Sequence, residues 1–142
     1  MNTPINEPKL FTVEEANKVL PVLQEILKEI VSLKRKIENK QAEIDALEII
    51  ADETTPKVRA ELIERSREFN EMVDEFNKLI RQIENTGAVL KDVDQGLVDF
   101  YGTVEGKMVF LCWKLGEAQV AYWHDIESGF ANRKAIEGFG NV

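Results

Sequence analysis

The sequence predicts an α+β protein, in which a long antiparallel two-helix hairpin of coiled-coil type precedes a small antiparallel β-meander of three to four strands. Two observations lead to this fold class. Through residues 12–86, apolar side chains recur at alternating spacings of three and four, as in helices that bury one stripe. After Gly87 they recur with a period of two, which is typical of strands. We expect a single domain over residues 12–142, with the sheet at 87–124 and a C-terminal loop or tail at 125–142.

The first helix is expected to follow a flexible lead-in over residues 1–11. Thr12 and Glu15 have the spacing of a capping box, which satisfies backbone N–H groups at a helix start. Pro21 lies inside the helical pattern. Because proline lacks an amide hydrogen and clashes with the preceding turn, we expect a kink there, or a helix that restarts with Pro21 in its first turn. The apolar seam is formed by Ala16, Val19, Leu23, Ile26, Ile30, Leu33, Ile37, Ile44, Leu47 and Ala51.

The second helix is predicted to start at Thr55 and Pro56, as N-cap and first helical residue, after a break at residues 52–54. So short a connection makes the two helices antiparallel. Lys40 and Arg65 interrupt the two seams at neighbouring layers. We expect both side chains to reach surrounding glutamates and to set register or oligomeric state.

Segments rich in Val, Phe, Tyr and Trp are expected to form the strands. They are residues 88–90, 97–101, 107–113 and 119–123. Glu105 and Gly106 resemble a two-residue hairpin turn, and residues 115–118 a longer turn. If that second turn has four residues, Cys112 shares one face of the sheet with Asp99. His124 would then emerge on the opposite face, unless its strand ends first.

Composition and charge exclude several classes of protein. The net charge of −8 argues against binding to a nucleic-acid backbone or to anionic lipid, since both need a basic face. Cys112 is the single cysteine, so an intramolecular disulfide is impossible and a reducing compartment fits best. The N-terminal residues lack the basic start and apolar core of a signal peptide, and no apolar run is long enough to span a membrane. We therefore expect a cytoplasmic protein with neither nucleic-acid nor membrane partners.

Several longer motifs resemble a known family. They are FTVEEAN with a following LP (residues 11–21), GLVDF (96–100), LCWKLGE (111–117), YWH (122–124) and E-x-G-F-x-x-R (127–133). Together they are similar to the bacterial domain-of-unknown-function family numbered 2203, over nearly the whole chain. The resemblance implies a bacterial protein but no activity, because that family is uncharacterised. This chain has Tyr101 where the family pattern often has proline, which affects the path of the following loop.

Five polar residues form the candidate site: Asp99, Glu117, His124, Glu127 and Arg133. They are expected to line a small-molecule or metal site between the sheet and the start of the first helix. His124, Glu127 and Asp99 are the candidate ligands of a divalent metal, because they offer the nitrogen and oxygen donors that such ions prefer. The chain has no HExxH, CxxC or His-rich spacing that would identify the metal.

The same residues also fit a structural role. A lone histidine at the end of an aromatic strand, such as His124, is typical of a hydrogen-bonded core residue. Asp99 lies in an apolar strand and must be paired or face water. Arg133 is a suitable bidentate partner for Asp99 or Glu127, and such a pair would pin the tail to the sheet. Cys112 is expected to be an inert core residue rather than a nucleophile.

Two functions follow from these patterns. The heptads favour a non-enzymatic interaction or scaffold protein that forms a homodimer, in which two hairpins pair as a four-helix bundle. The alternative is a protein that binds a small molecule or a divalent metal at the polar site, with hydrolysis as one activity. The sequence names neither a substrate nor a pathway.

Overall fold

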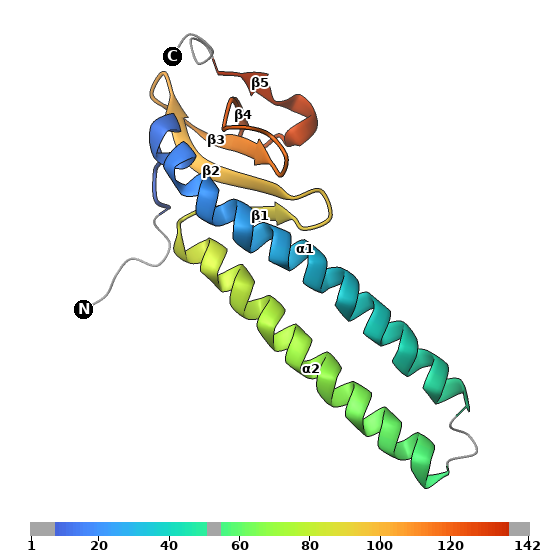
Figure 1. Cartoon of the computed structure of the whole chain (residues 1–142). Coiled ribbons are helices and arrows are strands. Elements are labelled where there is room, and N and C mark those ends of the chain that lie inside the picture. Colours follow the sequence, from blue (N-terminus) through green and yellow to red (C-terminus); the bar gives the residue numbers. More distant parts are fainter. Residues whose placement is uncertain (1–7, 51–54, 137–142) are drawn as a thin grey trace. The chain divides into compact units, whose positions relative to one another are not determined.

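The protein consists of two long helices followed by a five-stranded antiparallel sheet (Figure 1), as a computed structural model shows for residues 8–50 and 55–136. The helices are α1 (Val13–Ile50) and α2 (Pro56–Asn85), which run antiparallel. The predicted α+β class and helical hairpin are therefore confirmed. The predictions for residues 1–7, for the break at 52–54 and for the end of the tail lie outside the described residues.

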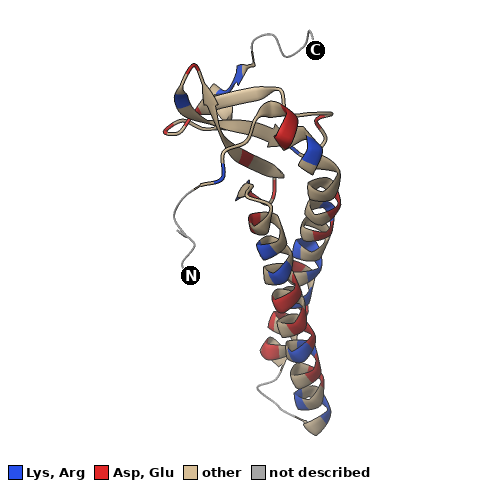
Figure 2. Ribbon diagram, turned by 90° about the vertical axis from the view of Figure 1, so that its left-hand side faces the viewer, with Lys and Arg blue, Asp and Glu red and all other residues tan. Residues whose placement is uncertain are grey.

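The chain divides into two compact units, Lys28–Arg81 and the combination of Met1–Leu27 with Gln82–Val142. The first unit is helical, and charged residues occur along both of its helices (Figure 2). Its two polar interruptions bind glutamates as the sequence predicts. Lys40 Nζ lies 2.9 Å from Glu68 Oε1, and Arg65 Nε lies 3.5 Å from Glu43 Oε1. Both contacts cross from one helix to the other, so they favour one register of the hairpin.

The starts of both helices are fixed by side-chain caps. The Thr12 N–H donates to Glu15 Oε1 at 2.9 Å, and the Glu15 N–H donates to Thr12 Oγ1 at 3.0 Å. These two bonds confirm the predicted capping box. Thr55 Oγ1 accepts a bond from the backbone of α2, which begins at the predicted Pro56. Helix α1 continues through Pro21, so the alternative of a restart there is wrong.

The sheet has the strand order β1-β2-β3-β4-β5, and each strand pairs antiparallel with the next. The strands are β1 (Val89–Asp92), β2 (Leu97–Val104), β3 (Lys107–Lys114), β4 (Tyr122–Asp125) and β5 (Lys134–Ala135), with a short 3-10 helix, η2 (Phe130–Asn132), before β5. The prediction of three to four strands misses β5, which lies in the segment expected to be a loop or tail. A strand of two residues is too short to show a period in sequence.

One face of the sheet packs against the beginning of α1. The ring centroids of Phe11 and Phe100 lie 5.0 Å apart, and the Val120 N–H donates to Asn17 Oδ1 at 2.7 Å. The Phe11 N–H donates to the Tyr101 carbonyl at 2.7 Å, and Phe11 is buried. Phe11 is therefore part of the core, and the prediction that the flexible lead-in extends to residue 11 is wrong. The core of this unit also contains Ala16, Leu20, Leu23, Leu27, Val98, Leu111 and Trp113.

Gly102 allows this close approach, and its replacement tests the packing. A Cβ atom at Gly102 would lie 2.9 Å from Leu111 Cγ and 3.0 Å from the Phe11 carbonyl oxygen. We expect Gly102→Ala to lower the free energy of unfolding in urea by about 1–3 kcal/mol, because the core must shift to accept it. Gly129→Ala is the control, because a Cβ there meets open space and the residue has an ordinary negative φ. Equal stability of the two variants would contradict this account of the core.

Candidate functional site

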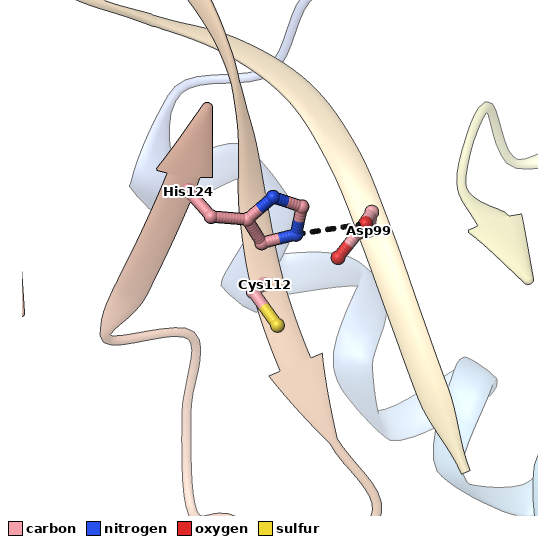
Figure 3. Close-up of side chains that lie close together, drawn as sticks. All are labelled: Asp99, Cys112 and His124. Atoms are coloured by element: carbon pink, nitrogen blue, oxygen red, sulfur yellow. Dashed lines mark hydrogen bonds and ion pairs between the residues drawn. The ribbon is translucent and has the colours of Figure 1, made fainter. Parts of the chain in front are cut away.

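Asp99, Cys112 and His124 meet on the face of the sheet opposite the α1 face, so the expected position of the site between the sheet and the start of the first helix is wrong. Asp99 is paired with Cys112 across β2 and β3, and His124 is paired with Phe110 across β3 and β4. Because Phe110 and Cys112 are two residues apart in one strand, their side chains point to the same face. The three side chains therefore point toward one another from adjacent strands (Figure 3).

The register of β4 corrects the sequence prediction for His124. With a four-residue turn, Cys112 would have paired with Ala121 and His124 would have faced the other side of the sheet. The strand instead starts at Tyr122, which is the partner of Cys112. This shift of one residue moves every side chain of the strand to the opposite face. It brings His124 to Asp99.

All three residues of this cluster are buried. The exposed fractions are 3% for Asp99, 1% for Cys112 and 2% for His124. One oxygen, one sulfur and one nitrogen atom from these residues lie within 4.8 Å of one another. Polar groups in such surroundings need partners, because each has lost its hydration. Among the described residues, every buried side-chain nitrogen or oxygen atom has a hydrogen-bond partner.

The hydrogen bonds of His124 place one proton on Nδ1. Nδ1 is 2.9 Å from the Asp125 carbonyl oxygen, which can only accept, so Nδ1 carries a proton and donates. Nε2 is 3.1 Å from Asp99 Oδ2. A hydrogen bond there requires one further proton, held either by the imidazole or by the carboxyl group. Nε2 is thus the ring atom that faces the cluster, and its partner is an acid.

Cys112 is a protonated thiol in this environment. Burial raises its pKa to about 12, and the Asp99 carboxylate adds to the increase because it repels a thiolate. The Arg133 guanidinium, with Nη1 4.0 Å from the sulfur, acts in the opposite direction. A thiol in this state is a poor nucleophile.

Arg133 binds Glu117 rather than Asp99 or Glu127. Its Nη1 donates to Glu117 Oε1 at 3.1 Å, and its Nη2 donates to Glu117 Oε2. The guanidinium also lies 4.0 Å from the Tyr122 ring centroid and 4.2 Å from that of Phe130. Arg133 therefore forms a bidentate pair as predicted, but its partner is Glu117, and the predicted partners Asp99 and Glu127 are wrong. The pair attaches the segment around η2 and β5 to the turn after β3.

The turn after β3 holds the Glu117 carboxylate in place for Arg133. Glu117 Oε1 also accepts a bond from the Lys114 N–H at 2.9 Å. Burial raises the pKa of Glu117, but the bonds from Arg133 and Lys114 outweigh that effect and lower it overall. Glu127 is exposed, and the structure places it outside the buried cluster. Of the five predicted site residues, Asp99 and His124 thus meet in the cluster, while Glu117 and Arg133 form a pair beside it.

Lys91 is a site residue that the sequence did not indicate. Its Nζ lies 3.6 Å from Asp99 Oδ2 and 4.0 Å from the Phe110 ring centroid. The polar cluster also borders a pocket of about 110 Å³, which is lined by Lys91, Leu97, Asp99, Cys112, His124, Ser128, Gly129 and Phe130. The role of Lys91 was not predictable from the sequence because the residue lies in a short edge strand. Only the pairing of β1 with β2 places it beside Asp99.

The fold and the cluster define a helical-hairpin α+β protein with a buried Asp/Cys/His group on its sheet. The sequence model of a family described as "Uncharacterized conserved protein (DUF2203)" matches residues 9–136, and the chain belongs to this family. This confirms the resemblance seen in its motifs. No curated protein and no solved structure matches the chain. Within the described residues, neither helix is both long enough and apolar enough to cross a membrane.

The pair of Arg133 and Glu117 predicts a dependence of stability on pH. We expect Arg133→Gln to lower the free energy of unfolding at pH 7 by about 1–2 kcal/mol, because a partly buried carboxylate loses its charged donors. The pKa of Glu117 is lowered in the folded protein, so the stabilisation is present above the ordinary Glu pKa of about 4.3 and is lost as the pH falls through the folded value.

The difference between wild type and Arg133→Gln should therefore shrink between pH 6 and pH 3 in urea titrations. Lys134→Gln is the control, because it removes the neighbouring positive charge from an exposed residue. A difference that stays constant on acidification would show that Glu117 is not the partner whose ionisation matters.

Proposed function

We propose that this protein binds a divalent transition-metal ion, with zinc as the best match, through Asp99, Cys112 and His124. The observation that carries the proposal is the convergence of an oxygen, a sulfur and a nitrogen donor, all buried, from three adjacent strands. Carboxylate, thiolate and imidazole are the three common protein ligands of zinc. Magnesium and calcium take oxygen ligands, so a set that includes sulfur disfavours them.

The distances in the cluster suit a tetrahedral ion after a small contraction. With zinc bond lengths of about 2.0–2.3 Å, a tetrahedral ion separates its ligand atoms by roughly 3.3–3.6 Å. The Asp99 and His124 donors are already 3.1 Å apart, and all three atoms lie within 4.8 Å. Rotation of the Cys112 side chain and a modest separation of the other two are the adjustments that an ion would require.

The tautomer of His124 also supports the proposal. Metal-binding histidines usually donate the N–H of the other ring nitrogen to a carbonyl or carboxylate, which fixes the ring and makes the free nitrogen more basic. His124 does this with the Asp125 carbonyl, so that Nε2 faces Asp99 and Cys112. With Nδ1 bonded to the carbonyl and Nε2 bound to the ion, His124 would have no nitrogen left to act as a general base. This arrangement favours binding over acid–base catalysis.

A purely structural pair is a poorer account of the cluster. Two buried ionisable side chains in a small sheet give up their hydration, and replacement of such a pair by apolar residues is often neutral or stabilising. A third potential ligand beside them has no role in that account. In the metal proposal, the ion replaces the proton shared by Asp99 and His124 and the proton on the Cys112 thiol.

Metal content of variant proteins tests the proposal. We expect wild-type protein dialysed against zinc and then against buffer to retain about one ion per chain, as measured by plasma mass spectrometry. Cys112→Ser and Asp99→Asn should each weaken zinc binding by more than about 100-fold, since a lost ligand costs more than a lost outer hydrogen bond, which costs about 10–100-fold. Both replacements conserve size, so circular dichroism should show folded protein.

Glu127→Gln is the matched control. The sequence predicts Glu127 as a metal ligand, but in the structure its carboxylate is exposed and lies outside the cluster. This variant should keep full zinc content. Since binding expels at least the Cys112 proton, the affinity of wild type should also rise by about tenfold or more per unit between pH 6 and pH 8. Zinc content that is absent in wild type, or unaffected by Cys112→Ser and Asp99→Asn, would overturn the proposal.

We also propose that the helical hairpin self-associates as a homodimer. In the unit Lys28–Arg81, apolar residues at heptad spacing are only half-buried, namely Leu33 and Ile37 in α1 and Phe69, Met72 and Phe76 in α2. Ile49 is 79% exposed and Ile63 is 66% exposed. Two helices cover only one side of each other's apolar stripe, whereas a four-helix bundle covers the rest. This supports a scaffold role alongside metal binding, and a second copy of the hairpin is the partner of matching shape.

Light scattering after size-exclusion chromatography measures this association. We expect wild type to have about twice the monomer mass of 16.2 kDa at micromolar concentration. Ile63→Glu should shift the mass toward the monomer, because a charge is placed in the apolar contact. Ile126→Glu, at an exposed isoleucine of the sheet-containing unit, should leave the mass unchanged. A wild-type monomer at these concentrations would exclude the dimer.

A further inference from the structure

We infer that the metal ion is completed by a small carboxylate ligand that occupies the pocket beside the cluster, and that Lys91 provides the counter-charge for this ligand. The inference rests on the metal site proposed above and names the class of molecule that the site takes. Three protein ligands leave a tetrahedral ion with one open position, as in zinc sites that bind water or a substrate.

The open position faces the pocket. The donors of Asp99, Cys112 and His124 all rise from one face of the sheet, so the fourth direction of an ion held by them points away from the strands. In that direction the three residues form one side of the pocket. The remaining lining comes from β1, the start of β2 and the segment that leads into η2, namely Lys91, Leu97, Ser128, Gly129 and Phe130.

The balance of charge at the site favours a monovalent anion. A divalent ion is neutralised by the Asp99 carboxylate and the Cys112 thiolate. Arg133 is already paired with Glu117, so it adds no net charge. Once an ion takes Asp99 as a ligand, Lys91, whose Nζ lies 3.6 Å from Asp99 Oδ2, would be left as the net positive charge among the residues that line the pocket. The Lys91 side chain is 38% exposed, so water screens part of its charge, and the remaining charge favours an anionic partner at the open position.

The position of Lys91 fits this role. Its Nζ is 3.6 Å from Asp99 Oδ2, and the Phe110 ring, with its centroid 4.0 Å away, holds the ammonium at the pocket. When an ion takes the Asp99 carboxylate as a ligand, Lys91 loses much of that attraction. A second carboxylate, bound to the ion in the open position, restores it.

The volume of the pocket limits the size of the ligand. About 110 Å³ corresponds to roughly three or four water molecules at about 30 Å³ each. This matches a carboxylate with one or two carbon atoms, whereas an aromatic ring would have to extend beyond the pocket. The side chains of Leu97 and Phe130 give the pocket apolar walls, against which a methyl group can pack. Acetate therefore matches the charge, the size and the lining.

Cobalt(II) in place of zinc makes the site visible, because its absorption spectrum reports the ligands of the ion. We expect wild-type protein loaded with cobalt to change its spectrum on titration with acetate and to reach saturation. Lys91→Met should bind cobalt at least as well as wild type, because a competing cation is gone, but should bind acetate at least tenfold more weakly. Lys107→Met is the control, because Lys107 pairs with Asp125 on the sheet and does not line the pocket. It should behave as wild type.

The outcomes separate the two proposals. If cobalt does not bind to wild type, the metal site itself is wrong. If cobalt binds and acetate leaves its spectrum unchanged, the metal site stands and the carboxylate ligand is overturned. Equal acetate affinity in wild type and Lys91→Met would overturn the role of Lys91. Benzoate tests whether the carboxylate belongs to a larger molecule. We expect it to bind at least tenfold more weakly than acetate, and equal binding would overturn the assignment of a small ligand.

Discussion

The pairing register of β3 and β4 is the constraint on which the site depends. It sets His124 opposite Phe110 and so places the imidazole on the same face as Cys112 and Asp99. A slip of one residue would turn His124 to the α1 face and leave Asp99 buried without this partner. The register is held by the Val120 N–H, which donates to Asn17 of α1 just before β4 begins. The hairpin helix thus contributes to the chemistry without adding a ligand.

The polar groups around Asp99, Cys112 and His124 form a network of hydrogen bonds and ion pairs. The Asp125 carbonyl fixes the tautomer of His124, whose other nitrogen meets Asp99, and Lys91 balances the same carboxylate from the edge strand. On the other side, Arg133 lies against Cys112 and is itself balanced by Glu117. A metal ion enters such a group by displacing protons, so its binding and the ionisation of the cluster are one equilibrium. This coupling is why a thiol that is unreactive alone remains suitable as a ligand.

Local features were predictable from the sequence, whereas features that depend on pairing were not. The capping box of Thr12 and Glu15 and the hairpin turn at Glu105 and Gly106, whose φ angles of 51° and 79° are both positive, are set by neighbouring residues. Asp99 and His124 were predictable as site residues because a polar side chain in an apolar strand requires a hydrogen-bonding or charged partner. Their meeting depended on the length of the connection before β4, which no periodicity reveals.

X-ray absorption at the zinc edge tests most directly whether Asp99, Cys112 and His124 together hold one metal ion. The account predicts one sulfur at about 2.3 Å and nitrogen or oxygen neighbours at about 2.0–2.2 Å, in four-coordinate geometry. A spectrum without sulfur, or with six oxygen and nitrogen neighbours, would place the ion elsewhere and contradict the account.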